Sequence, residues 1–406
     1  MRSKSNFTSL YTRMLWLLLV LPVYHSLQAQ QASKVETVKL ETLIFPLQDQ
    51  HVHGASLVEL PNGDFLAVWF QGSGERNADD VRIMGARLAS GNKEWSKPFL
   101  MADTPRIPDC NPVLFLNAQN KLFLVWIAVL ANRWEQSVLR LRVSNDYSQN
   151  GAPTWEWQDN ILLKPGKEFE DEVASTFSKL PKSEAGWSEY AQTYDAQIIE
   201  ASKDAAKRSI GWMTRIKPLV EEDGRIILPL YSDGFNFSMM ALSEDHGKIW
   251  KPSLPLVGRG PIQPALARRK NGDIVALMRD SGDAPGRVHN SVSLDGGKSW
   301  SVAEKTDMPN TASVELLKWD EDNWFFLGND IDDGRYRLSL YRSQDEGESW
   351  ELVGRLEEDE SKSGSFSYPC LIRGSDHKLH ITYSYHLSSG LKSIKYKVLD
   401  PSTFFH

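Results

Sequence analysis

Six polar side chains stand at matching places along the chain, each at or just before the start of an apolar, strand-like segment. They supply an imidazole, two amides, an ammonium group, a carboxylate and a phenol: His53, Asn111, Lys217, Gln263, Glu315 and Tyr368. A ring of such groups would be a poor hydrophobic core but a good sugar-binding site, because every member can donate or accept hydrogen bonds. This chemistry becomes available only if the fold brings the six segments to one place.

A repeated turn motif indicates what that fold is. The pattern Ser-x-Asp-x-Gly-x-x-Trp occurs at residues 243–250, 293–300 and 343–350, with a spacing of 50 residues. In a turn of this kind the Asp carboxylate can accept backbone N–H groups, Gly can adopt a positive φ, and Trp can pack beneath the turn. We therefore interpret the motif as structural and assign no catalytic role to its aspartates.

Upstream of each turn, an apolar segment, a polar turn and a second apolar segment follow one another, and six copies of this pattern are present. Their alternation and their β-branched and aromatic content predict β-hairpins. Four-stranded units repeated at this period close into a ring, because closure removes exposed sheet edges. The sequence therefore predicts an all-β fold, a six-bladed β-propeller of four-stranded antiparallel blades. A seven-bladed ring with one unrecognised blade is the alternative.

One interval between the hairpin copies is longer than the others. Residues 165–208, between the second and third copies, are rich in Glu, Ala, Lys and Ser, and segments such as FEDEVASTFSKL have helical periodicity. We predict a helical insertion between blades two and three, on one face of the ring. It would be either a solvated decoration or a lid over the site.

The first residues resemble a signal peptide. Arg2, Lys4 and Arg13 come before or at the edge of an apolar run over residues 14–24, and a cleavage site follows at Ala29. Residues 1–29 are then a leader, and residues 30–406 form a single propeller domain that is exported to the periplasm or secreted. An uncleaved membrane anchor is the less favoured alternative, because the apolar run is short for a bilayer span.

The composition excludes several other classes of protein. A formal net charge of −7 argues against a nucleic-acid binder, and 41% hydrophobic with 24% charged residues is the composition of a globular domain without stable membrane insertion. Cys110 and Cys370 are the only cysteines, and they could pair or remain as buried thiols. No spacing typical of metal ligands occurs, and we expect neither a metal nor another cofactor.

The turns and the six-fold repeat together resemble the sialidase superfamily, whose turns are known as Asp-boxes or BNR repeats. The resemblance implies an exo-acting glycosidase that releases a terminal acidic sugar, with arginines holding the sugar's carboxylate. Two of them match Arg279 and Arg335, although Arg337 is a near competitor of the latter. The first family arginine is replaced by His53. Arg106 lies in an Arg-Ile-Pro string that opens blade two, and we interpret it as a coincidence.

The resemblance also implies catalytic residues. Tyr368, in Tyr-Pro-Cys-Leu, matches the tyrosine nucleophile of sialidases, which depart from the usual scheme of two carboxylates. The glutamate that polarises this tyrosine is replaced by Gln263, which cannot take a proton, and Glu315 is the nearest substitute by repeat position. The loop after the first hairpin offers three candidates for the acid/base: Glu75, Asp79 and Asp80. We favour Asp79.

Two other functions remain open. A polysaccharide lyase or another glycosidase acting on uronate- or rhamnose-containing glycans would use His53 or a tyrosine as its base, together with a cation that neutralises a carboxylate. The residues that could form such a site are His53, Arg215, Lys217, Tyr383, Tyr385 and His386. A carbohydrate-binding propeller without catalysis is the third possibility.

Overall fold

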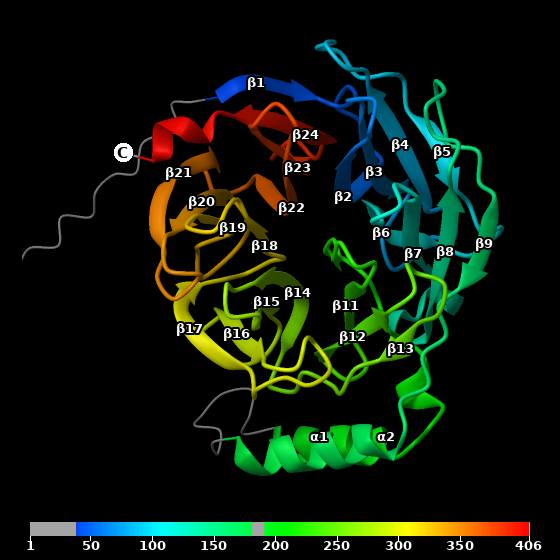
Figure 1. Ribbon diagram of the computed structural model, residues 1–406, viewed down its shortest axis with the longest axis vertical. Helices are drawn as coiled ribbons and strands as arrows, with labels where there is room; N and C mark the ends of the chain where they lie inside the picture. Colours follow the sequence, from blue (N-terminus) through cyan, green and yellow to red (C-terminus); the bar gives the residue numbers. More distant parts are fainter. Residues whose placement is uncertain (1–37, 181–190, 406) are drawn as a thin grey trace, which may run out of the picture. The chain divides into compact units, whose positions relative to one another are not determined.

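Six four-stranded antiparallel sheets are arranged in a ring in the computed structural model, which describes residues 38–180 and 191–405 (Figure 1). This arrangement confirms the six-bladed β-propeller. The predicted leader at residues 1–29 and its boundary at residue 30 lie outside the described residues.

Five blades are each built from one continuous run of strands. Blade one contains β2 (His51–Glu59), β3 (Phe65–Gly72), β4 (Arg82–Leu88) and β5 (Phe99–Ala102). Blade two contains β6 (Asp109–Leu116), β7 (Leu122–Val129), β8 (Ser137–Ser144) and β9 (Trp157–Asn160). Blade three contains β10 (Leu219–Val220), β11 (Ile226–Ser232), β12 (Phe237–Ser243) and β13 (Lys251–Pro252). Blade four contains β14 (Pro261–Arg268), β15 (Ile274–Asp280), β16 (Arg287–Ser293) and β17 (Glu304–Pro309). Blade five contains β18 (Glu315–Lys318), β19 (Trp324–Gly328), β20 (Arg337–Ser343) and β21 (Glu351–Glu358).

The sixth blade joins the two ends of the described chain. It contains β22 (Ser365–Arg373), β23 (Leu379–His386) and β24 (Lys392–Leu399), and its outer strand is β1 (Val38–Leu43). Strand β1 pairs antiparallel with β24 from Val38 opposite Leu399 to Leu43 opposite Lys395. The ring is therefore closed by backbone hydrogen bonds between distant segments.

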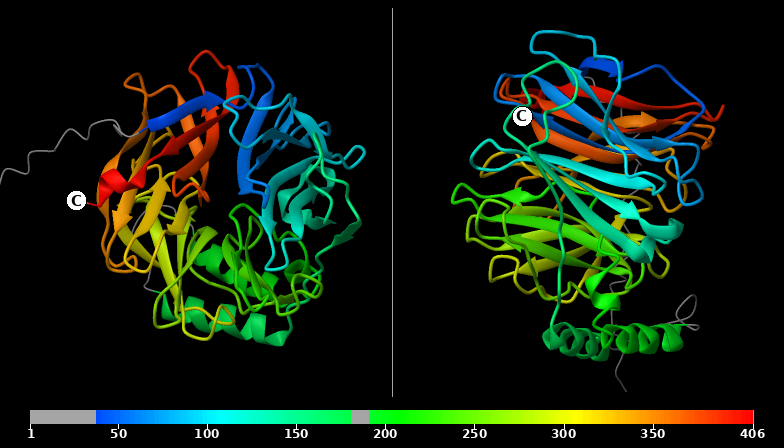
Figure 2. Two further views of the ribbon diagram at one scale, coloured as in Figure 1. Left: turned by 45° about the horizontal axis from the view of Figure 1, so that its top comes forward. Right: turned by 90° about the vertical axis from the view of Figure 1, so that its right-hand side faces the viewer.

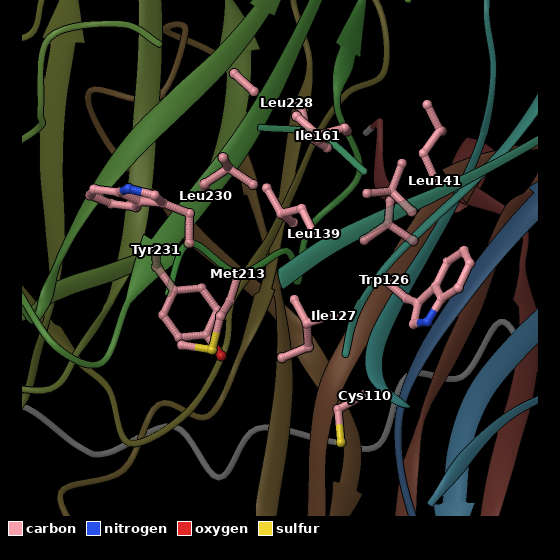
Figure 3. Packing of buried hydrophobic residues seen from close by; sticks show 14 of the residues in the cluster. Cys110, Trp126, Ile127, Leu139, Leu141, Ile161, Met213, Leu228, Leu230 and Tyr231 are labelled. Atoms are coloured by element: carbon pink, nitrogen blue, oxygen red, sulfur yellow. The ribbon is translucent and has the colours of Figure 1, made fainter. Parts of the chain in front are cut away.

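The core lies between neighbouring blades. Strand β7 is buried along its whole length, as expected for a strand whose two faces are both covered. Figure 3 shows Ile127 and Leu139 of blade two directed toward Leu230 and Tyr231 of blade three. Cys110 belongs to the same cluster. Both cysteines of the chain are buried and unpaired, so the open question of a disulfide is answered by two free thiols.

The three Asp-box turns have the geometry that the motif predicts. In the turn of blade four, Asp295 accepts hydrogen bonds from the backbone N–H groups of Lys298 and Ser299 at 3.0 and 2.9 Å. Ser293 donates to the same carboxylate at 2.8 Å, and Gly297 has a φ of 87°. Asp245 and Asp345 make equivalent bonds. These aspartates hold the turns together.

The insertion between blades two and three is helical, as predicted, but it lies at the outer edge of the ring and not on one face, as was expected. Helices α1 (Lys167–Lys179) and α2 (Ala191–Ser202) lie beside the outer edge of the ring and leave its centre uncovered (Figures 1 and 2). The Phe169 ring packs against Phe235 and Phe237, with centroids 5.4 and 6.0 Å apart. The insertion is a decoration of blade three in this structure. Among residues 38–180 and 191–405, no helix is long and apolar enough to cross a membrane.

Candidate active site

Four inner strands share an irregularity that shapes the candidate site. In blades one, two, four and six the pairing of the inner hairpin slips by one residue at the same place. The residues at the slip have left-handed backbones: Gly54 (φ 66°), Asn111 (φ 50°), Gln263 (φ 58°) and Tyr368 (φ 57°). A bulge of this kind removes a residue from the ladder and redirects its side chain. A non-glycine residue with this backbone is strained, and such strain is typical of functional sites.

The hairpin turns show which residues occupy equivalent positions. Each inner hairpin ends in a turn closed by a backbone hydrogen bond, for example from Arg269 N to Asp273 O in blade four. Gln263 and Tyr368 both lie six residues before the donor of their own turn bond. By the same count the six equivalent residues are Gly54, Asn111, Arg215, Gln263, Ser313 and Tyr368. The predicted register was correct in blades two, four and six. In the other three blades the predicted residue was not the equivalent one. His53 precedes Gly54 by one residue, and Lys217 and Glu315 follow Arg215 and Ser313 by two.

Tyr368 is the centre of the group. Arg279 Nη1 donates to its hydroxyl at 3.0 Å, and Gln263 Nε2 donates to it at 3.4 Å. Two further guanidinium groups lie over the phenol ring, with Cζ of Arg215 4.8 Å and Cζ of Arg335 5.3 Å from its centroid. The phenol is nearly buried, with 8% of its residue surface exposed. Three cations therefore surround one tyrosine.

These cations change the acidity of the phenol. Burial works to raise the pKa of Tyr368, but the positive charges of Arg279 and Arg335 outweigh it, and the net result is a pKa below the usual value. Within residues 38–180 and 191–405, the Tyr368 hydroxyl has no carboxylate hydrogen-bond partner. The ionised form is thus favoured by its surroundings without an adjacent base.

Arg279 and Arg335 differ from Arg337 in their partners. Arg337 forms an ion pair with Asp330 at 2.8 Å and approaches Glu358 at 3.9 Å. Neither Arg279 nor Arg335 has a carboxylate partner among the residues that the structure describes. Two half-buried, unpaired guanidinium groups on one tyrosine are able to bind an anion. That these two residues bind substrate stays a prediction, while Arg337 is occupied elsewhere.

The ring of His53 packs against the ring of Tyr368. His53 is the residue that replaces the first arginine of the sialidase pattern. Its ring centroid is 4.0 Å from that of Tyr368, and its Nδ1 is 2.8 Å from the hydroxyl of Ser384. Burial, with the nearby charge of His386, keeps the pKa of His53 well below its usual value. His386 donates Nε2–H to the carbonyl of Val52 at 2.7 Å, and burial lowers its pKa to about 4. Both imidazoles are therefore neutral at pH 7.

The loop after β3 carries the three predicted acids, and two of them are directed to other partners. Asp79, the favoured candidate, is exposed and accepts from Asn132 Nδ2 at 2.6 Å. Asp80 accepts from the backbone N–H and the hydroxyl of Ser73 at 3.0 and 2.8 Å, and these bonds lower its pKa. Asp80 holds the loop together, and Asp79 joins it to the loop of blade two.

Glu75 is the acid of this loop whose charge acts on the tyrosine. Its Oε2 lies 3.2 Å from Nε2 of His51. The negative charge of Glu75 raises the pKa values of both Tyr368 and Arg335, although larger effects oppose it at each of them. The structure thus brings Glu75, and not Asp79, into the electrostatic environment of the tyrosine.

Lys217 and Glu315 form a buried ion pair instead of lining the site separately. Lys217 Nζ lies 2.6 Å from Glu315 Oε1, and the same oxygen accepts from the backbone N–H of Leu316 at 3.1 Å. Only 1% of Glu315 is exposed. Within the described part of the chain no hydrogen bond joins Glu315 to Tyr368, so the geometry does not support Glu315 as its base.

The remaining predicted residues are divided between the site and other networks. Asn111 Nδ2 donates to the hydroxyl of Tyr231 at 3.0 Å, beside the tyrosine group. Tyr383, by contrast, donates to the buried Glu357, and Lys395 lies 4.4 Å from the ring centroid of Tyr385. These two tyrosines belong to a separate charge cluster between blades five and six. Of the set predicted for a lyase, His53 and Arg215 contact Tyr368, and the ring centroid of His386 lies 5.5 Å from that of His53.

Sequence reasoning missed two residues of the site and misplaced a third in the repeat. His51 and Ser384 carry no motif, and nothing in the sequence distinguishes them. Arg215 was noticed, but Lys217 was placed at its position, since the hairpin turn was not used to count the repeat. No group of three His, Cys, Asp or Glu side chains arranged to hold a metal ion occurs in residues 38–180 and 191–405.

Comparisons with known proteins agree with the fold. The family model described as a BNR repeat-like domain matches residues 63–208 and 202–381. A Dyadobacter fermentans protein of unknown function has a similar structure, with a TM-score of 0.65, 13% identity, and coverage of 89% of this chain and 98% of that one. The K499G mutant of the NanB sialidase of Streptococcus pneumoniae has a TM-score of 0.63 and 12% identity, and the match covers 89% of this chain and 70% of that one. The intramolecular trans-sialidase of Ruminococcus gnavus has a TM-score of 0.61 and 13% identity, and the match covers 87% of this chain and 95% of that one. No curated protein matches the chain.

Proposed function

Because the chain belongs to the BNR repeat-like family and has a sialidase-like propeller, we propose that it is a glycoside hydrolase that releases a terminal acidic sugar from a glycan. The observation that supports this most strongly is Tyr368 beside the unpaired Arg279 and Arg335. A tyrosine and a pair of guanidinium groups suit a sugar that carries its carboxylate next to the bond that breaks. The solved structures support the fold, and the site residues support the chemistry.

The arginines bind the sugar and place it. Arg279 and Arg335 hold the sugar carboxylate through charge-assisted hydrogen bonds, which stay strong in a half-buried site. The anomeric carbon, which bears that carboxylate, is then held against the hydroxyl of Tyr368. His53 contributes a neutral imidazole at the position where an arginine would add a third charge, so the carboxylate is bound by two cations and one hydrogen-bonding ring.

Tyr368 is the proposed nucleophile. Its oxygen loses its proton to solvent and forms a bond to the anomeric carbon as the glycosidic bond breaks, and the leaving oxygen takes a proton from an acid on the β3–β4 loop. Water then attacks the same carbon and restores the tyrosine, with the acid's conjugate base accepting a proton from that water. A carboxylate nucleophile would be repelled by the sugar's own carboxylate, and a phenol oxygen with delocalised charge is repelled less.

We assign the acid to Glu75, in the pair that it forms with His51. Asp79 stays the alternative on the same loop. The two are separated by Glu75→Gln and Asp79→Asn, each of which removes one proton donor with little change in size. A loss of turnover that is restored with a substrate carrying an acidic leaving group identifies the residue that donates the proton.

A uronate lyase is the second candidate, and one observation favours it. The ring centroid of the neutral His53 lies 4.0 Å from that of Tyr368, and Arg279 and Arg335 could neutralise a uronate carboxylate. The imidazole or the phenol would then remove the proton next to that carboxylate. Elimination leaves a C=C bond that absorbs in the ultraviolet, and hydrolysis does not.

The test is a screen of the purified protein against sialosides, other acidic glycosides and uronate polysaccharides, with released sugar and ultraviolet absorbance followed in parallel. We expect released acidic sugar without new absorbance, abolished by Tyr368→Phe and retained by Tyr385→Phe, whose ring lies in the other cluster. Absorbance without free sugar would identify a lyase. Saccharide binding that survives Tyr368→Phe, with no turnover by either protein, would identify a binding propeller.

The site of action is also part of the proposal. A leader-like N-terminus, with Arg2 and Lys4 before an apolar run, supports export to the periplasm or the medium. Fractionation of cells that produce the full chain, with N-terminal sequencing of the exported protein, tests it. A cytoplasmic, uncleaved product would contradict it.

A further inference from the structure

Of the three arginines around Tyr368, Arg215 is the one that is too buried to bind a substrate. Only 2% of it is exposed. Its Nη2 donates to the carbonyl of Pro369 at 3.0 Å, and its Nη1 donates to that of Ala55 at 3.4 Å. Blade three thus reaches the bulges of blades six and one at once. These hydrogen bonds stabilise the left-handed backbone at Tyr368 and at Gly54, because their acceptors are the carbonyl groups of the next residues.

The charge of Arg215 has no free counter-ion in the described part of the chain. Both of its hydrogen-bond partners in the described residues are carbonyl oxygens, and its Nε is buried without a partner. Glu315, whose charge helps to offset the burial of Arg215, is committed to Lys217. A buried guanidinium without a counter-charge is costly, so a negative charge is expected within reach of it.

The ring of Tyr368 is the group next to Arg215 that could carry this negative charge. The Arg215 guanidinium lies 4.8 Å from the ring centroid, where a cation interacts far more strongly with a phenolate than with a neutral phenol. Burial lowers the pKa of Arg215, and the charge of Tyr368 is the largest effect that opposes it. A cation at this distance from the ring favours the ionised tyrosine, in addition to the larger effects of Arg279 and Arg335.

The hydrogen bonds on the phenol oxygen act in the same direction. Arg279 and Gln263 both donate to it, and neither is positioned to take its proton. The other charged or titratable groups facing the ring are Arg335, His53, Tyr231 and Glu75, of which Arg335 favours ionisation and Glu75 opposes it. An oxygen that receives two donors is best satisfied as an anion.

We propose that Arg215 is a positioning residue that favours the phenolate form of Tyr368, in place of the carboxylate base that Gln263 cannot supply. The phenol proton goes to solvent before substrate binds, and the phenolate oxygen then forms the bond to the anomeric carbon. This rests on the proposed function only in making Tyr368 the nucleophile. The tendency of Tyr368 to ionise is a property of the free protein and can be measured without substrate.

The experiment is an alkaline titration of tyrosine absorbance, which needs no substrate. The chain has 12 tyrosines, so the titration of Tyr368 is the difference between the wild type and Tyr368→Phe. We expect Tyr368 to ionise below the value of about 10 that is usual for tyrosine. Ionisation at or above that value in the wild type would overturn the proposal without any Arg215 variant.

Arg215→Gln then tests the assignment to this arginine, each variant being compared with its own Tyr368→Phe double mutant. Loss of a cation at this range is expected to move the titration of Tyr368 upward by about one pH unit. Arg215→Lys, which keeps the charge, is expected to restore most of the shift. Arg87→Gln is the matched control, since Arg87 is also buried and hydrogen-bonded but pairs with Asp64. An unchanged titration in a folded Arg215→Gln variant would refute the role of Arg215.

The titration also separates this inference from the proposed function. If Tyr368 ionises early and no acidic glycan is cleaved, the inference stands and the function fails. If an acidic sugar is released while Tyr368 titrates normally, the function stands and the inference fails. Where turnover is present, the acidic limb of the pH profile of kcat/KM is expected to move upward in Arg215→Gln by the same amount as the titration.

Discussion

Replacing Lys217 by Met tests the buried ion pair and the status of Glu315 together. The change leaves a carboxylate that is 1% exposed with one remaining hydrogen bond, from its neighbour Leu316. Removing one partner of a buried pair costs about 3–5 kcal/mol of unfolding free energy. Because the Lys217 side chain is 21% exposed, water can reach part of the gap, and we expect the lower end, about 3 kcal/mol.

The double variant Lys217→Met/Glu315→Leu supplies the comparison. With both charges removed, the free energy of unfolding is expected to return to within about 1 kcal/mol of the wild type. Urea unfolding followed by circular dichroism measures these three proteins and the single variant Glu315→Leu, and the double-mutant cycle over the four gives the coupling. Losses below about 1 kcal/mol in the Lys217→Met protein would show that the pair is effectively solvated and that the reasoning is wrong. Turnover by a folded double variant would remove Glu315 from the catalytic residues, and its loss would restore Glu315 as a candidate.

Other predictions concern activity, the Asp-box turns and pH. Arg279→Ala is expected to lower kcat/KM by about 10- to 150-fold, since a charge-assisted hydrogen bond is worth about 1.5–3 kcal/mol, whereas Arg337→Ala should leave substrate binding unchanged in the same assay. Asp295→Ala is expected to cost about 1–2 kcal/mol in urea unfolding and to leave turnover intact, and a folded but inactive variant would contradict the structural role of the turn. The pKa of His386 is about 4 in the folded protein against 6.5 for the free side chain, so the unfolded chain binds a proton first and stability falls as the pH drops from about 6.5 toward 4. His386→Gln should flatten that decline, and an identical pH profile of thermal unfolding in both proteins would show that the buried imidazole is not responsible.

The architecture was predictable because it depends on local signals that repeat. Turns such as that of Asp295 need Ser, Asp, Gly and Trp at fixed offsets, and the apolar hairpins between them can only become sheets that cover one another. The period therefore predicted six blades before any contact was known. The helical insertion was equally readable, because its periodicity differs from that of the strands.

The site was less predictable because it depends on bulges and loops. The left-handed residue at Tyr368 adds a position that the strand alternation does not reveal. In blade three the inner strand β10 is only two residues long, so the position of Arg215 had to be counted from the turn. The choice between Glu75 and Asp79 depends on how one loop folds back, and composition does not distinguish two carboxylates four residues apart.

The pairing of β1 with β24 also sets the order in which the molecule can be made. A nascent chain that has emerged only as far as β21 holds five complete blades and a strand without its partner. During that interval, the apolar flanks of the first and fifth blades face water, and β1 offers an unpaired edge to any neighbouring strand. Synthesis is thus expected to pass through an open intermediate that is exposed to aggregation. The ring can close only after β24 has left the ribosome and paired with β1.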